Sequence, residues 1–139
     1  VSRADPKLPV ARWGIGLAYE QKGMGSEALT SLEEATRLSK SLNILGSLAH
    51  AHARFGQHTQ AREILTRLEE RSRKSYVPSY HFALVYTGLG ERDRAFEWLE
   101  RAYQERSTVL AYLRIDPRLA PLRSDPRYAD LVRRIGFPS

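Results

Sequence analysis

The sequence predicts an all-α protein built from repeated helical hairpins. Three glycines recur at nearly equal intervals, 33 residues from Gly23 to Gly56 and 34 residues from Gly56 to Gly90. A stretch of helical periodicity follows each of them, with small residues where a partner helix must come close, as at Ala95 and Ala102. A period of about 34 residues is typical of helix-turn-helix repeats in which each copy is one hairpin. The 139 residues accommodate three such hairpins and a shorter tail.

The elements of these hairpins follow from apolar periodicity, glycine and proline. The three hairpins are expected over residues 9–41, 42–75 and 76–106. Their helices are expected over residues 9–22, 26–38, 43–55, 58–73, 79–89 and 91–106. Pro9 and Pro78 suit the first turn of a helix, where the missing N–H costs no hydrogen bond. The helix over 43–55 is rich in small residues, namely Gly46, Ser47, Ala49, Ala51 and Ala53, and such residues let neighbouring helices approach closely but bury little area.

The tail, residues 107–139, breaks the period and is expected to form a helical cap. Asp116-Pro117 and Asp125-Pro126 each indicate a helix N-cap followed by proline at the first helical position. Apolar residues from Tyr128 to Ile135 follow helical spacing. Because the last hairpin of a stacked array leaves an apolar face exposed, we expect the tail to fold back and cover it.

The repeats resemble the tetratricopeptide repeat (TPR) family. In the third copy the consensus residue types occur at Phe82, Ala83, Tyr86, Gly90, Ala95, Leu99 and Ala102. In the first copy they occur at Ile15, Gly16, Tyr19, Gly23, Ala28, Leu32 and Ala35. The second copy matches less well, since His52 replaces the usual tyrosine and Leu68 the final alanine. The resemblance implies a TPR-type α-solenoid of three hairpins with a C-terminal helical cap.

The stretch over 76–138 is also similar to the C-terminal end of TPR regions in multidomain bacterial regulators. Such proteins carry a winged-helix, serine/threonine kinase or cyclase domain upstream, so this resemblance implies a scaffolding or sensory role within a larger signalling or transcription regulator. Val1 is not a methionine, and residues 1–8 show no helical stripe of their own. We therefore expect a fragment that begins with a linker or with the end of a preceding repeat.

In TPR proteins the first helix of each repeat lines a concave groove, so the resemblance implies a set of ligand-facing residues. They are Trp13, Leu17, Glu20 and Gln21 in the first repeat, Asn43, Ser47, His50 and Arg54 in the second, and Tyr80, His81 and Leu84 in the third. The aromatic and leucine side chains are expected to anchor a peptide or helix of a protein partner, with His50 and Arg54 adding polar specificity. The same residues have an alternative role, packing against neighbours or the tail. The Lys and Asn clamp that grips chaperone tails is absent.

Two further interaction classes remain open. The net charge is +6, and residues 108–139 hold six arginines against three aspartates. A basic tail of this kind would contact nucleic acid, although arginine and acidic residues interleaved on solvated helix faces explain the same composition. Self-association is the other class, because the helix over 9–22 would present an apolar face if a preceding repeat is missing.

Catalysis, cofactors and metals find little support. The chain has no cysteine and no nucleophile, zinc-protease or Walker motif, so we expect no enzyme. Gly23 to Ala28 matches G-x-G-x-x-A, but it follows a helix rather than a strand, and no bound dinucleotide is expected. His50 and His52 are two apart on a helix and diverge, so no metal site is expected. Without a long apolar run or a signal peptide, we expect no membrane partner and a cytoplasmic location.

Overall fold

The computed structural model describes residues 7–136, and these residues contain helices and no strand. The all-α prediction is therefore confirmed. Residues 1–6 and 137–139 lie outside the described part. Most of the expected N-terminal linker over 1–8, and the last three residues of the expected tail over 107–139, fall in these ranges.

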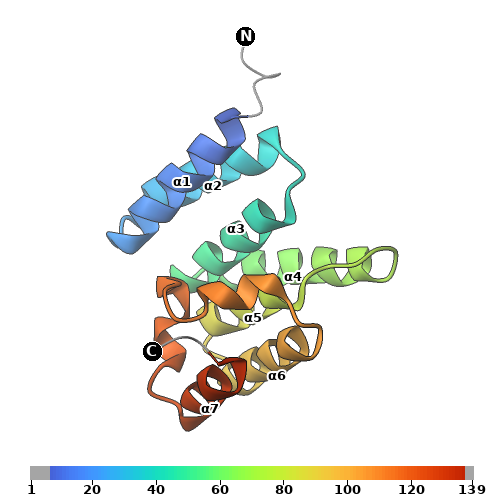
Figure 1. Cartoon of the computed structure of the whole chain (residues 1–139). Coiled ribbons are helices and arrows are strands. Elements are labelled where there is room, and N and C mark those ends of the chain that lie inside the picture. Colours follow the sequence, from blue (N-terminus) through green and yellow to red (C-terminus); the bar gives the residue numbers. More distant parts are fainter. Residues whose placement is uncertain (1–6, 137–139) are drawn as a thin grey trace.

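Six α-helices form three hairpins that follow one another along the molecule (Figure 1). The helices are α1 Lys7–Gln21, α2 Gly25–Leu38, α3 Leu42–Arg54, α4 His58–Ser72, α5 Ser79–Gly88 and α6 Arg92–Gln104. All bounds lie within two residues of those expected from sequence. The start of α1 is one difference: Lys7 and Leu8, assigned above to the linker, belong to the helix.

The three hairpin turns share one backbone geometry. Gly23, Gly56 and Gly90 have φ of 75°, 85° and 79°, a left-handed conformation that a side chain would strain. The residue after each glycine donates its N–H to a carbonyl five residues earlier, as Met24 does to Tyr19 at 3.0 Å. This is the hydrogen bond of a Schellman C-cap, and it satisfies a carbonyl that the ending helix leaves free. The glycines therefore act as the stop signals that their spacing indicated.

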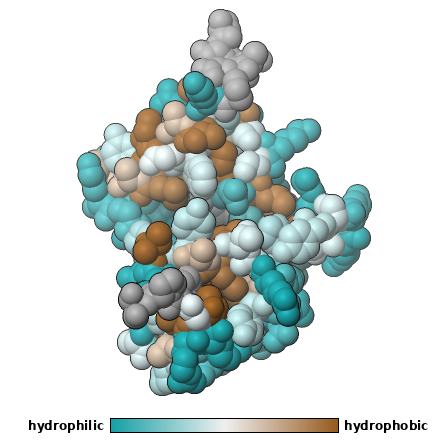
Figure 2. Space-filling view, in the orientation of Figure 1, coloured by the Kyte–Doolittle hydropathy of each residue, from teal (hydrophilic) through white to brown (hydrophobic). Residues whose placement is uncertain are grey.

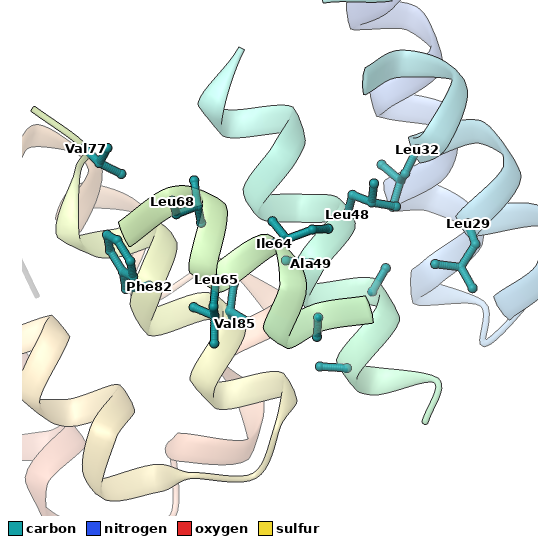
Figure 3. Packing of buried hydrophobic residues seen from close by; sticks show 13 residues of the cluster. Leu29, Leu32, Leu48, Ala49, Ile64, Leu65, Leu68, Val77, Phe82 and Val85 are labelled. Atoms are coloured by element: carbon teal, nitrogen blue, oxygen red, sulfur yellow. The ribbon is translucent and has the colours of Figure 1, made fainter. Parts of the chain in front are cut away.

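Helix α3 lies at the centre of the first core cluster (Figure 3). Leu48 of α3 packs there with larger side chains from α2, α4, α5 and the segment before α5, namely Leu29, Leu32, Ile64, Leu65, Leu68, Val77, Phe82 and Val85. The small residues of α3 let these helices come near: a Cβ at Gly46 would stand 3.2 Å from Nδ1 of His81. The small area expected for this helix is thus offset by contact on several sides.

The tail continues as two 3₁₀ helices and one α-helix, η2 Thr108–Tyr112, η3 Pro117–Leu122 and α7 Pro126–Ile135. The side chains of Asp116 and Asp125 accept the backbone N–H of Arg118 and Arg127 respectively, so both act as the expected N-caps. The tail buries five leucines in a second core cluster with α5 and α6, namely Leu110, Leu113, Leu119, Leu122 and Leu131. It thus packs onto the last hairpin, with η3 against α5 and α7 against α6.

Candidate functional site

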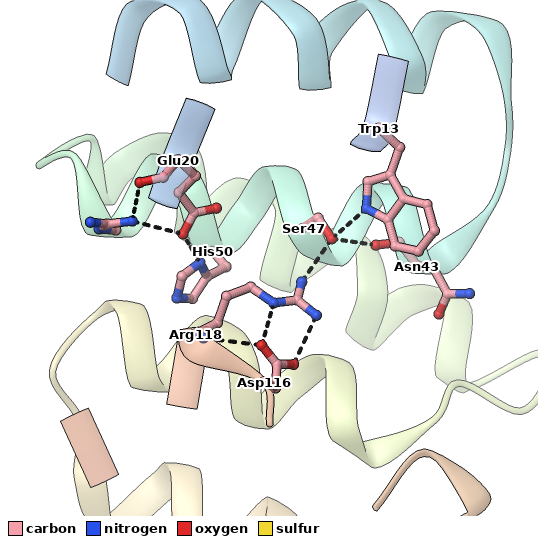
Figure 4. A network of polar contacts seen from close by, with 8 residues as sticks. Trp13, Glu20, Asn43, Ser47, His50, Asp116 and Arg118 are labelled. Carbon is pink, nitrogen blue, oxygen red and sulfur yellow. Dashed lines mark hydrogen bonds and ion pairs between the residues drawn. The ribbon is translucent and has the colours of Figure 1, made fainter. Parts of the chain in front are cut away.

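A hydroxyl on α3 joins three parts of the chain (Figure 4). The Oγ of Ser47 accepts a hydrogen bond from Nε1 of Trp13 on α1 and another from Nη1 of Arg118 in the tail, both at 2.9 Å. Ser47 in turn donates to the carbonyl of Asn43 at 2.9 Å. The first hairpin, the second hairpin and the tail therefore meet at a buried serine.

Arg118 is held by a neighbouring carboxylate. Its Nε donates to Oδ1 of Asp116 at 3.0 Å and its Nη2 to Oδ2 at 2.9 Å, a two-point contact of fixed geometry. The hydroxyl of Tyr80 donates to the same Oδ2 at 2.7 Å. Burial alone would raise the pKa of Asp116, but the contacts from Arg118 and Tyr80 outweigh it and hold that pKa below its usual value. Burial, together with the charge of Asp116, raises the pKa of Tyr80.

A second group of charges links α1 to α3. Glu20 is fully buried, and its Oε2 lies 2.9 Å from Nδ1 of His50 and 3.5 Å from Nη1 of Arg54. Arg54 also donates to the backbone carbonyl of Glu20. Burial acts to raise the pKa of Glu20, but the hydrogen bond and charge of His50, with the charges of Arg118 and Arg54, lower it overall. The ionised carboxylate of Glu20 therefore links α1 to α3 through His50 and Arg54.

The structure places most of the predicted ligand-facing residues in the interior. Six of them are buried, with exposed fractions of 4% or less: Glu20, Ser47, His50, Tyr80, His81 and Leu84. Tyr80 and Leu84 pack in the second core cluster, because the tail lies over this side of α5. His50 and Arg54, expected to select a partner, bind Glu20 instead. Trp13 and Leu17 remain half-buried.

A pocket of about 540 Å³ lies between α1, α3, α5 and the tail. The part of its lining that sequence analysis identified consists of Trp13, Leu17, Gln21, Asn43, Tyr80, His81 and Leu84. The tail supplies the rest, namely Val109, Tyr112, Ile115, Asp116, Pro117 and Arg118. Tyr112 and Ile115 are 58% and 70% exposed, so large apolar groups stand at its rim. The resemblance and the helical phase therefore identified the lining residues on α1, α3 and α5, but they identified none of the lining residues in the tail.

One signal for the missed residues is present in the sequence. Asp116-Pro117-Arg118 and Asp125-Pro126-Arg127 are copies of one tripeptide. In both copies the aspartate caps a helix, and the arginine two residues later donates hydrogen bonds from Nε and Nη2 to the same carboxylate. The duplication predicts a locally fixed arginine in each copy, but the contact of Arg118 with Ser47 depends on how the tail folds.

The tail arginines with described contacts are engaged within the protein. Arg127 binds Asp125 and Asp93 and lies 4.5 Å from the ring centre of Phe96. Arg133 binds Asp130, and Arg134 binds Asp130 and Glu100. Arg123 donates to two backbone carbonyls. Contact with nucleic acid would require several of these pairs to open, which weakens that alternative.

On the face shown in Figure 2, hydrophobic side chains gather over α1. Val10 and Ile15 are 58% and 42% exposed there. Gly14 lies between them, and a Cβ added to it would meet no atom within 4 Å. Val10 and Ile15 are five residues apart, about 140° around a helix, so they do not form one continuous apolar face. Self-association through α1 stays a prediction.

No family model matches the sequence, and no curated protein or solved structure matches it either. Within residues 7–136 there is no group of three or more histidine, cysteine or acidic side chains arranged to hold a metal ion. In the same range, every helix is too short or too polar to cross a membrane.

Proposed function

We propose that this chain is a protein-interaction module that binds a peptide segment in the pocket between α1 and the tail. The observation that carries the proposal is the pocket itself, which is open, mainly apolar and rimmed by exposed Tyr112 and Ile115. Its volume of about 540 Å³ lies in the range of sites that hold a ligand. Apolar walls with a few polar groups suit a peptide with a large apolar anchor residue.

The TPR resemblance supports the same function. The hairpin turns repeat at Gly23, Gly56 and Gly90, and Ala95 and Ala102 are fully buried at the positions where a TPR-type solenoid needs small residues. We assign the chain to this class, as part of a larger cytoplasmic bacterial regulator. Protein binding is the function such repeats serve, whereas the particular partner depends on the site.

The proposed mode differs from that of an open TPR groove. Tyr80 and Leu84 pack against the tail, so a partner reaches the third hairpin only where its residues line the pocket. Trp13 and Leu17 on one wall, with Tyr112 and Ile115 on the rim, are the apolar groups a partner would contact first. The tail is therefore part of the binding surface as well as a cap.

Selection from a random peptide library, followed by calorimetry with the synthetic peptides, tests this proposal. Leu17→Arg places a charge on the apolar wall and is expected to weaken binding by about ten-fold or more. Ile15→Arg is the matched control, because Ile15 is exposed on the same helix but does not line the pocket. It should change the Kd by less than about two-fold.

Ile115→Arg provides an independent variant for the same test. Ile115 is 70% exposed, so its replacement does not disturb the core, yet it lines the pocket. We expect selected peptides to lose affinity for this variant as they do for Leu17→Arg. If no peptide is enriched, or if both substitutions leave the affinities unchanged, peptide binding in this pocket is wrong.

A further inference from the structure

The pocket wall contains a histidine, His81, whose imidazole ring makes no hydrogen bond to any other of residues 7–136. His81 is 4% exposed and lines the pocket, and its Nδ1 is enclosed without a hydrogen-bond partner. The other ring nitrogen, Nε2, is not enclosed in this way. The neighbouring polar groups are already satisfied, since Tyr80 donates to Asp116 and Arg118 binds both Asp116 and Ser47. Because Nδ1 is enclosed, a ligand in the pocket can pair only with Nε2.

The surroundings of His81 keep its ring neutral. Burial is the larger cause and the positive charge of Arg118 the smaller one, and together they lower the pKa of His81 to about 4. A neutral imidazole carries a single N–H. An N–H on the enclosed Nδ1 would be a buried donor without an acceptor, which is costly, so the proton is favoured on Nε2. The ring then offers a donor on its open side.

The nearby charges favour one kind of ligand group. Asp116 and Arg118 of the tail line the pocket together with His81, whereas Glu20 on α1 and His50 on α3 form a separate ion pair. Of these, Arg118 is the one whose charge acts on the imidazole of His81. The charge of Arg118, acting on the same imidazole, favours a hydrogen-bond acceptor over a cation beside this N–H.

We infer that the peptide bound in this pocket carries a hydrogen-bond acceptor beside its apolar anchor, a carbonyl or hydroxyl oxygen that accepts the Nε2–H of His81. Peptides with lysine or arginine at that place are selected against. This inference rests on the proposed function and adds a specificity-determining residue to it. Because the acceptor would pair an N–H that has no partner within the described part of the chain, on a side chain that is only 4% exposed, we expect a contribution of about ten-fold in affinity.

Two fragments that share one apolar body test the inference. The probes are 3-phenylpropanamide, which ends in an acceptor, and 3-phenylpropan-1-amine, which is a cation at neutral pH. Titrations followed by NMR should show the amide binding about ten-fold more tightly than the amine. Long-range ¹H–¹⁵N spectra of the histidine rings should show His81 as the Nε2–H tautomer and a shift of its Nε2 resonance on addition of the amide.

Two variants test whether the preference for the amide over the amine depends on His81. His81→Phe keeps an aromatic ring but removes the donor, so the preference for the amide should become several-fold smaller, and only the part due to the charge of Arg118 should remain. His58→Phe is the control, since His58 is exposed at the start of α4, and it should retain the preference for the amide. The ring spectra of the wild-type protein give an independent answer if His81→Phe does not fold.

Several results would overturn the inference. They are equal affinities for the two fragments, no binding of the amide up to about 10 mM, a preference of undiminished size in His81→Phe, or an unshifted His81 ring. A different result would contradict the proposed function alone. In that case the two fragments bind as expected but no peptide is selected from the library, and the ligand that carries the acceptor is a small molecule. Selected peptides that bind equally well to His81→Phe remove only the inference.

Discussion

Arg118 of the tail and Ser47 of α3 are 71 positions apart in sequence, yet Nη1 of Arg118 donates to Oγ of Ser47 at 2.9 Å. The same oxygen accepts the indole N–H of Trp13. A tail that serves as a cap on the last hairpin thereby also contacts the second hairpin and closes one side of the pocket.

Arg118→Ala is expected to lower the free energy of unfolding by about 2 to 4 kcal/mol. The side chain of Arg118 is 14% exposed and that of Asp116 7%, so removal of the arginine leaves a buried carboxylate without its cation. Urea denaturation followed by circular dichroism measures the change. Arg133→Ala is the control, because Arg133 is 76% exposed, and it should cost less than about 1 kcal/mol. Equal losses in the two variants would show that the tail is not held by Arg118.

Stability should fall as the pH decreases from 7 to 5, in part because of His81. Its pKa is about 4 in the folded protein, against 6.5 for the ordinary side chain. Between these values the unfolded chain binds a proton that the folded protein does not, so protonation favours unfolding. The contribution of His81 amounts to about 2 kcal/mol between pH 7 and pH 5.

Denaturation of the wild-type protein and His81→Phe at both pH values measures this contribution. The variant should lose less stability than the wild type, because it has no group to protonate at that position. Glu20 and Asp116 act in a lower window: their pKa values are lowered, so the stability they contribute is present above about pH 4.5 and lost below it. Parallel pH profiles for the two proteins between pH 7 and 5 would contradict the assignment.

The buried contact between Glu20 and His50 should appear as an interaction energy between the two residues. We expect a double-mutant cycle with Glu20→Ala and His50→Ala to give about 1 to 3 kcal/mol. Each single variant leaves the other residue buried without its partner, so the second substitution costs less than the first. Denaturation of the four proteins under one condition gives the value. Additive effects would show that the two side chains do not stabilise each other.

Two glycines on α1 should respond to alanine in opposite directions. A Cβ at Gly16 would lie 2.6 Å from Cγ of Leu32 and 3.3 Å from the carbonyl of Ala28, so Gly16→Ala should destabilise the protein by about 1 to 3 kcal/mol. A Cβ at Gly14 meets no atom within 4 Å, so Gly14→Ala should stabilise the helix by about 0.5 to 1 kcal/mol. Thermal denaturation of both variants decides the matter. A destabilised Gly14→Ala would mean that this face is covered in solution.

The sequence predicted the helices well because their signals are local. Glycine at the left-handed turn positions and aspartate before proline act on the residues beside them, so Gly23 ends a hairpin helix and Asp125 begins α7 as expected. Trp13 and Leu17 were also assigned to the binding surface from helical phase, and both line the pocket. The prediction that Tyr80 faces a partner was wrong, because helical phase does not show where the tail lies, and the tail covers this residue.

The sequence by itself therefore determined the helices, their turns and the small residues at which they cross, because these depend on backbone conformation and on side-chain size. Only the tertiary structure decided that Arg118 reaches Ser47, that Glu20 is buried between His50 and Arg54, and that the tail forms one wall of the pocket. Such contacts join distant segments, and they form where the balance of apolar burial and charge pairing over the whole chain is most favourable.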